Sequence, residues 1–378
     1  MPREAIIAAY VRSPFTFARK GGLASVRPDD LGAHVIRALL ERTGVAGAEI
    51  EDVVWGCAFP EGEQGLNIGR VASLRAGLPI TTAGMTVNRW CGSSVQAIQI
   101  AAGMVMMGAG EALIAGGTES MSRVPMMGFN ILPPPSWSAA EVSDFINVGL
   151  TAERVAREQD ITRADQDAFA FGSHSKAMAA RVAGRLAAEI APIMVNGTLV
   201  SEDGCIRDAT LDGLATLKTV FLEGGTVTAG SSSPMTDGAT ALLVCTPEFA
   251  TKHALKPMAR IAGFGVSGCD PGIMGMGPVE SSRKAVARAG LKMADIDVVE
   301  MNEAFASQAE ACRRLLEIDP AKLNIDGGAI ALGHPLGATG GRLVGKAAAL
   351  LQRVGGRYGL ATQCIGGGMG IAMVLEAL

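Results

Sequence analysis

A stretch near the start of the chain recurs near its end, and this internal repeat limits the possible folds more than any other feature. Residues 43–59 (TGVAGAEIEDVVWGCAF) parallel residues 289–305 (AGLKMADIDVVEMNEAF). In each copy a helix is expected to end at a glycine, and a Val-Val strand then leads to a small polar group before Ala-Phe. Such repetition predicts two related α/β halves. The alternative is a chance likeness between two ordinary βαβ units.

The length of the chain and the change in composition along it predict three structural parts. A chain of 378 residues is too long for one ordinary core. After residue 117 come long polar helical runs and three consecutive prolines, before an apolar strand resumes near Ala239. We therefore expect an N-terminal half at 1–117 and 235–255, an inserted loop domain at 118–234, and a C-terminal half at 256–378. Insertions of this length usually cover a site or an interface.

Composition narrows the possible partners and locations. A net charge of −4 argues against nucleic acid as a partner. Seven cysteines without a CxxC pair predict a reduced compartment and no structural metal site. The chain enters a strand-like run directly and has no apolar stretch long enough for a bilayer, so we expect a cytoplasmic protein without a membrane span. A methionine cluster at 104–107 is expected in the core.

The first candidate reactive group is Cys91, between a β-like run and an apolar helix in the stretch MTVNRWCGSSVQAIQIAAG. A thiol at the first turn of a helix meets free backbone N–H groups and the positive end of the helix dipole. We expect this setting to lower the pKa of Cys91 and to favour the nucleophilic thiolate. A small buried cysteine packed at a helix start is the alternative.

Three further polar side chains lie in glycine-rich or strand-end positions. His334 lies in GGAIALGHPLGATGG, after a strand-like LNID run, and is a candidate base for a cysteine. Cys364 lies in TQCIGGGMG, where free backbone N–H groups are available to an oxyanion. Asn302 follows the second Val-Val strand and can hold a water or donate to an oxyanion. Two thiols and a histidine at one sheet edge suggest carbon-acid chemistry, whereas loops kept for packing are the alternative.

Four blocks together resemble the thiolase family: VNRWCGSS around Cys91, NEAF at 302–305, GGAIALGHPLGATGG around His334 and CIGGGMG around Cys364. TAGSSSPMTDGA at 228–239 adds a fifth, so the resemblance covers essentially the whole chain. It implies a thiolase-like fold in which two duplicated mixed-sheet α/β halves form α-β-α-β-α layers with an inserted loop domain.

The resemblance also implies roles for these residues. Cys91 would be the nucleophile that carries the acyl thioester, His334 the base that activates it, and Cys364 the acid and base at carbon 2. Asn302 would hold the water of one oxyanion hole with His334, while the backbone N–H groups of Cys91 and Gly366 would form the other. Contacts with coenzyme A (CoA) are implied for five residues, namely Arg207, Ala229, Ser233, Ala304 and Phe305. No permanently bound cofactor or metal is implied, because CoA is a substrate.

The implied reaction is thiolytic cleavage of a 3-ketoacyl-CoA by CoA, as in fatty-acid β-oxidation, and its reverse is a Claisen condensation. The CGSS form and GCDPGIMGMGPV at 268–279 resemble degradative 3-ketoacyl-CoA thiolases. The alternatives are a short-chain acetoacetyl-CoA thiolase, a decarboxylating condensing enzyme and a non-catalytic acyl-CoA carrier. Asn147-Val148 before Gly149, and Pro234 after Ser233, depart from the short-chain pattern. A homodimer or homotetramer is implied, and membership of a β-oxidation complex is open.

Overall fold

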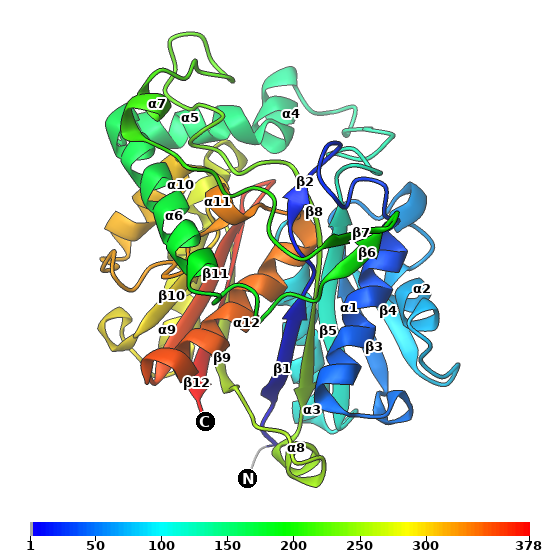
Figure 1. Ribbon diagram of the computed structural model, residues 1–378. Helices are drawn as coiled ribbons and strands as arrows, with labels where there is room; N and C mark the ends of the chain where they lie inside the picture. The colour runs from blue at the N-terminus through cyan, green and yellow to red at the C-terminus, as the bar shows by residue number, and fades with distance from the viewer. Residues whose placement is uncertain (1–2) are drawn as a thin grey trace.

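The computed structural model describes residues 3–378, whose main sheet consists of two related halves joined edge to edge (Figure 1). The strand order is β4-β3-β5-β8-β1 in the first half and β9-β12-β11-β10 in the second, and β1 and β9 are paired only over a short stretch. The strands of the main sheet are β1 (Ile6–Arg12), β2 (Thr16–Phe17, paired with β8), β3 (Asp52–Gly56), β4 (Ala83–Val87), β5 (Ala112–Ser120), β8 (Thr236–Cys245), β9 (Ala259–Gly268), β10 (Val298–Met301), β11 (Tyr358–Ile365) and β12 (Met369–Ala377).

The two halves repeat the same pairing directions. In the first half β1 pairs antiparallel with β8, β8 antiparallel with β5, and β5 parallel with β3. In the second half β9 pairs antiparallel with β12, β12 antiparallel with β11, and β11 parallel with β10. The predicted duplication is therefore confirmed as a shared topology.

The second half lacks a full counterpart of β4, so the strand expected at LNID was wrong. Only Leu323 forms a bridge there, with Val299 of β10. The next residue, Asn324, adopts a left-handed conformation (φ 44°) and turns the chain away. Its side chain bonds the strand instead: its Oδ1 accepts from the Met301 N–H at 2.8 Å, and its Nδ2 donates to the Met301 carbonyl at 2.9 Å.

Helices form three layers around these strands. Two helices, α3 and α12, contribute to one core between the two halves of the sheet. A second core lies under α1 and α2, and a third lies under α9 and α10. The helices of these layers are α1 (Pro28–Thr43), α2 (Ile68–Arg75), α3 (Ser93–Met107), α9 (Gly277–Arg288), α10 (Ala306–Leu315) and α12 (Leu336–Val354). The expected α-β-α-β-α order is thus present.

The central helix α12 is buried over most of its length, and its glycines explain how it fits. Every residue from Leu336 to Ala348 is buried. A Cβ at Gly341 would lie 2.1 Å from Thr240 Oγ1 of β8, and one at Gly340 would lie 2.4 Å from a methyl of Val95 in α3. The glycines of the ATGG run therefore let α12 pack against both neighbours at close range.

The chain between β5 and β8 lies outside the main sheet (Figure 1). Its elements are α4 (Ala139–Ile146), α5 (Val148–Glu158), α6 (Arg163–Val182), the β6–β7 hairpin (Ile193–Val195 and Thr198–Val200) and α7 (Leu211–Ala215). Two short helices complete the fold, namely α8 (Pro247–Lys252) and α11 (Ala329–Leu332). The domain limits expected above, 118–234 for the insertion among them, stay a prediction.

The methionine cluster at 104–107 was expected in the core, and this was wrong for two of its members. Met104 packs partly against the central core. Met106 and Met107 lie at the end of α3 and are 45% and 86% exposed. The sequence could not show this difference, because a helix with apolar residues on every side does not reveal which face meets the core.

Candidate active site

A cavity of about 320 Å3 brings together residues from both halves and from the chain between β5 and β8. It lies where β11 ends and where the loops before α3 and α12 meet, and its wall is almost entirely apolar. Among the predicted residues, it is lined by Cys91, His334, Cys364, Gly366, Ser233, Ala304 and Phe305. Two apolar clusters meet in it, one containing Cys91 and the other containing Cys364.

Cys91 lies in the loop between β4 and α3, just before the helix N-cap Gly92. The preceding Trp90 adopts a left-handed conformation (φ 43°), an uncommon one for a bulky residue that turns the loop sharply. The side-chain amide of Gln363 donates to the Cys91 carbonyl and so ties this loop to β11. The thiol is therefore held at the junction of the two halves.

The expectation of a lowered pKa for Cys91 was wrong. Burial raises the pKa of the Cys91 thiol to about 11, and the charge of Glu119 adds to the rise. A hydrogen bond from the Gly366 backbone N–H opposes these effects, but it does not outweigh burial. As a whole residue Cys91 is half-buried. The sequence showed the helix start but not the apolar wall around the thiol, which depends on the tertiary fold.

The glycine turn after β11 places Gly366 beside Cys91. Gly367 and Gly368 have φ values of 76° and 81°, a region that favours glycine. A Cβ at Gly366 would lie 2.4 Å from the Trp90 ring. This close approach places the Gly366 backbone near Cys91, and its N–H opposes the rise in the pKa of Cys91.

His334 and Asn302 form a buried polar pair beside the cavity. Asn302 Nδ2 lies 3.3 Å from His334 Nε2, and His334 Nδ1 lies 2.6 Å from Thr339 Oγ1. Because an amide nitrogen can only donate, this contact assigns an acceptor role to Nε2, which leaves Nδ1–H to donate to Thr339. Burial, together with the charge of Arg342, lowers the pKa of His334 to about 3, so its imidazole is neutral at neutral pH.

Cys364 lies near the end of β11 and is 1% exposed. Burial raises the pKa of its thiol well above the usual value, and the neighbouring Cys91 adds to this rise. A protonated thiol in an apolar wall can deliver a proton to carbon and take it back, which is the chemistry that acid and base catalysis requires.

The segment with Ser233 forms the other wall of the cavity. It pairs with the NEAF segment: the Ser233 N–H donates to the Ala304 carbonyl at 2.9 Å, and the Ala306 N–H donates to the Ser231 carbonyl at 2.8 Å. Two of the expected CoA contacts do not line the cavity. Ala229 is exposed on the same segment, and the guanidinium of Arg207 lies over the Phe17 ring at 5.2 Å.

Sequence reasoning missed several parts of the site. Thr339, which is hydrogen-bonded to His334, lies in the glycine-rich block around that histidine, and Gln363 directly precedes Cys364. The sequence pattern therefore could have indicated both residues. No sequence pattern indicated three methionines of the cavity wall, because Met121, Met126 and Met127 follow the end of β5 in a loop of no regular pattern.

Among residues 3–378, no group of histidine, cysteine and acidic side chains has a metal-binding arrangement. Within that range, no helix combines the length and apolar character that crossing a bilayer requires.

Comparisons with known proteins agree on one family. The thiolase N-terminal domain matches residues 5–248, and the thiolase C-terminal domain matches residues 255–377. The 3-ketoacyl-CoA thiolase of Bacillus subtilis is 44% identical over 99% of both chains. The β-ketothiolase BktB of Cupriavidus necator is 42% identical over 100% of both chains. The crystal structure of the Bacillus anthracis acetyl-CoA acetyltransferase has a TM-score of 0.91 and 36% identity, and it covers 100% of this chain and 99% of that one. The chain therefore belongs to the thiolase family and is an acyltransferase.

Proposed function

We propose that this enzyme is a degradative 3-ketoacyl-CoA thiolase, which cleaves a 3-ketoacyl-CoA with CoA to an acyl-CoA and acetyl-CoA. The observation that supports it best is the shared cavity, in which Cys91, His334 and Cys364 meet beside Asn302. The proposed site residues thus include a nucleophile, a neutral base and a second thiol. CoA and the 3-ketoacyl-CoA are the proposed substrates, in line with the printed names of the relatives.

In the first half-reaction, His334 takes the proton of Cys91 as the sulfur attacks carbon 3 of the substrate. The bond between carbons 2 and 3 then breaks, and its electron pair forms the enolate of acetyl-CoA. Cys364 gives its proton to carbon 2 of this enolate, and acetyl-CoA leaves. Cys91 now carries the acyl group as a thioester.

In the second half-reaction Cys364, left as a thiolate, takes the thiol proton of a new CoA, whose sulfur attacks the thioester. The bond between the acyl carbon and the Cys91 sulfur breaks, and His334 returns its proton to that sulfur. Asn302 supports an oxyanion site, because within residues 3–378 no donor reaches its buried Oδ1, which is free to accept from a water. The N–H groups of Cys91 and Gly366 would stabilise the other developing oxyanion. Ser233, Ala304 and Phe305 would contact the CoA chain at the wall, and Arg207 and Ala229 would contact it further out.

The apolar wall favours an acyl chain longer than acetyl. Met121, Met126 and Met127 lie on the Cys91 side, and methionine side chains adapt to ligands of different shape. An acetoacetyl-CoA thiolase remains the second candidate, since the similar Bacillus anthracis structure is named an acetyl-CoA acetyltransferase. We further propose a cytoplasmic homo-oligomer that works in fatty-acid β-oxidation.

A chain-length series tests this proposal. The protein is mixed with free CoA and with 3-ketoacyl-CoAs of increasing length, and the loss of enolate absorbance gives kcat/KM for each. We expect thiolysis with a maximum beyond the four-carbon substrate. A maximum at acetoacetyl-CoA would favour the short-chain alternative, and no turnover at any length would refute thiolase activity.

A further inference from the structure

Two buried carboxylates lie on either side of His334, and neither belongs to the reacting groups. Glu119 is the last residue but one of β5 in the first half, and Glu303 follows Asn302 just after β10 in the second half. Both are 1% exposed. Burial raises the pKa of both carboxyl groups, whereas the N–H and O–H donors that hold each of them oppose this rise and favour the ionised form.

Glu119 joins the loop after β3 to the start of α12. Its Oε2 accepts from the Ala58 N–H at 2.8 Å and from the Gly337 N–H at 2.9 Å. Its Oε1 accepts from Gln64 Nε2 at 2.7 Å and from the Phe59 N–H at 3.3 Å. Phe59 lines the cavity, and Gly337 lies three residues after His334.

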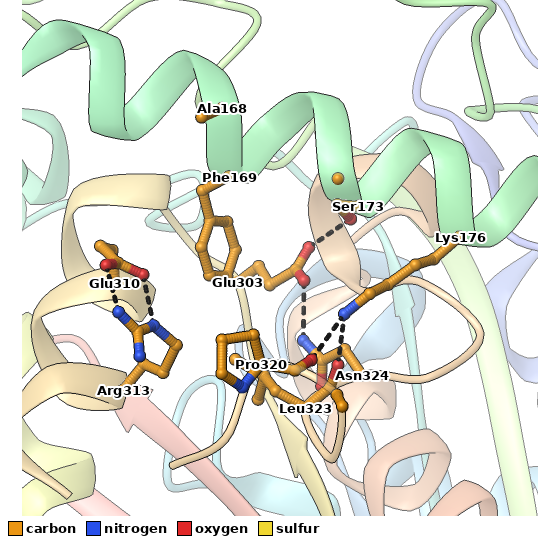
Figure 2. A pocket seen from close by; sticks show the side chains of 12 residues that line it. Ala168, Phe169, Ser173, Lys176, Glu303, Glu310, Arg313, Pro320, Leu323 and Asn324 are labelled. Carbon is orange, nitrogen blue, oxygen red and sulfur yellow. Dashed lines mark hydrogen bonds and ion pairs between the residues drawn. The ribbon is translucent and has the colours of Figure 1, made fainter. Parts of the chain in front are cut away.

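Glu303 joins α6 to the chain that precedes His334, and Figure 2 shows it between Ser173 and Asn324 in the wall of a second cavity. Its Oε2 accepts from Ser173 Oγ at 2.6 Å and from the Ile330 N–H at 3.1 Å. Its Oε1 accepts from Asn324 Nδ2 at 2.7 Å. Ile330 lies in α11, which ends just before the His334 loop.

Two glycines of the His334 block fit these carboxylates. A Cβ at Gly328 would lie 2.1 Å from Glu303 Oε1, and a Cβ at Gly337 would lie 2.7 Å from Glu119 Oε2. Both distances are shorter than any side chain allows, so the backbone can approach the carboxylates only as glycine. The glycine-rich character of the block therefore follows in part from these two contacts.

We infer that Glu119 and Glu303 are positioning residues that hold the His334 loop from both sides, one from each half of the molecule. Each carboxylate binds a backbone N–H on its own side of His334, at Gly337 and at Ile330. Each also reaches a second structural unit, so that the loop is fixed relative to Cys91 and Asn302. The inference rests on the proposed function, because it assigns the loop a role in the same reaction.

The test compares Glu119→Gln and Glu303→Gln with the control Asp52→Asn. Asp52 is also buried and accepts from a backbone N–H, but it lies at the start of β3, away from the cavity. Each oxygen of Glu119 accepts from two N–H donors, so the NH2 group of Glu119→Gln faces two donors in either orientation and repels both. Glu303 Oε1 accepts from one donor only, so the NH2 group of Glu303→Gln can be placed there against a single donor. We expect kcat for thiolysis to fall about a hundredfold in Glu119→Gln, with KM little changed, because small misplacements cost about that much. The fall in Glu303→Gln should be smaller, and the control should keep its kcat.

Alkylation of Cys91 by iodoacetamide gives a readout that needs no CoA substrate. The charge of Glu119 helps to raise the pKa of Cys91, so Glu119→Gln should be alkylated faster at a fixed pH. Each unit by which that pKa falls increases the thiolate about tenfold. Glu303→Gln and the control should react like the unaltered protein, whereas a general loosening of the site would speed alkylation in Glu303→Gln as well.

Three results separate the possible failures. If both glutamine variants fold and keep the kcat of the control, the inference is wrong. If Glu119→Gln does not fold, Glu119→Asp and Glu303→Gln decide, since a loss of kcat in each is still required. If the unaltered protein cleaves no 3-ketoacyl-CoA, the proposed function fails, and unchanged alkylation in Glu119→Gln would then refute the positioning role separately.

Discussion

Cys91 and His334 have opposite pKa shifts with the same cause. Burial raises the pKa of Cys91 to about 11 and lowers the pKa of His334 to about 3. Both groups are therefore neutral around neutral pH, and a resting thiolate–imidazolium pair is disfavoured. In the proposed mechanism the proton therefore moves to His334 only as the sulfur attacks, which would keep the thiol unreactive until a substrate arrives.

This neutral pair predicts a flat pH profile. Protonation would silence His334 only near its pKa of about 3, and Cys91 would lose its proton only near its pKa of about 11. We therefore expect kcat/KM, which reports the free enzyme, to be constant from about pH 6 to about pH 9. The measurement is thiolysis at constant ionic strength across that range. A titration near about 6.5, the ordinary pKa of histidine, would contradict the neutral buried pair.

Cys364 and Cys91 can be separated by their half-reactions. Cys364→Ala should lower thiolysis by about 10²- to 10⁴-fold, because protonation at carbon 2 is lost. It should still exchange an acyl group between an acyl-CoA and labelled CoA, since that step breaks no carbon–carbon bond. Cys205→Ala, a buried thiol outside the cavity wall, is the control and should retain both activities. Equal loss of exchange and thiolysis in Cys364→Ala would argue against its role at carbon.

At the scale of elements, α12 depends on its glycines for packing rather than for flexibility. In Gly341→Ala the new methyl would lie 2.1 Å from Thr240 Oγ1, so we expect a loss of about 1–3 kcal/mol in the free energy of unfolding. Gly103→Ala in α3 is the matched control, because a Cβ there meets nothing within 4 Å. That control should gain up to about 1 kcal/mol from better helix propensity. Urea unfolding measures both, and a shift of the same sign in the two variants would refute the packing argument.

The elements also show which parts of the structure the sequence could predict. The repeat at 43–59 and 289–305 predicted two halves of equal topology, because alternating apolar runs and glycine ends are local signals. The strand at LNID and the buried state of Met106 and Met107 were wrong, since both depend on tertiary neighbours. The prediction of a lowered pKa for Cys91 failed for the same reason. The helix start beside Cys91 is a local feature of the sequence, whereas the burial that raises the pKa depends on the tertiary fold. No sequence pattern indicated the role of Glu119, because its donors come from residues 58–64 and from Gly337, which are far apart in the chain.

At the scale of the whole molecule, β4 leaves one edge of the main sheet open. The Ala83 N–H donates to the Glu51 carbonyl and therefore points toward β3. Because successive N–H groups of a strand point to opposite sides, the N–H of Thr86, three residues later, faces the open edge. Leu66 and Ile80, which lie in the connections around α2, are 93% and 83% exposed. An open, partly apolar edge favours pairing with another strand, which agrees with the proposed homo-oligomer.

We therefore expect light scattering to give a dimer or a tetramer. Thr86→Pro removes an edge-facing N–H without breaking the ladder to β3, and it also removes the Thr86 hydroxyl, which bonds Asn67 and Gly69. It should therefore weaken assembly more than Thr86→Val, which loses the hydroxyl alone. Circular dichroism checks the fold of both variants. A monomeric unaltered protein at micromolar concentration would contradict the proposed assembly, and an unchanged mass for a folded Thr86→Pro would place the interface elsewhere.

Residues from both halves of the molecule line the cavity around Cys91, and the acyl group proposed for its sulfur can be measured directly. Intact-protein mass spectrometry after mixing with a 3-ketoacyl-CoA, in the absence of free CoA, should show one added acyl group. Peptide mapping should locate it on Cys91, and Cys91→Ala should show neither the adduct nor turnover. An unmodified Cys91 during active thiolysis, or full turnover by Cys91→Ala, would contradict the proposed mechanism.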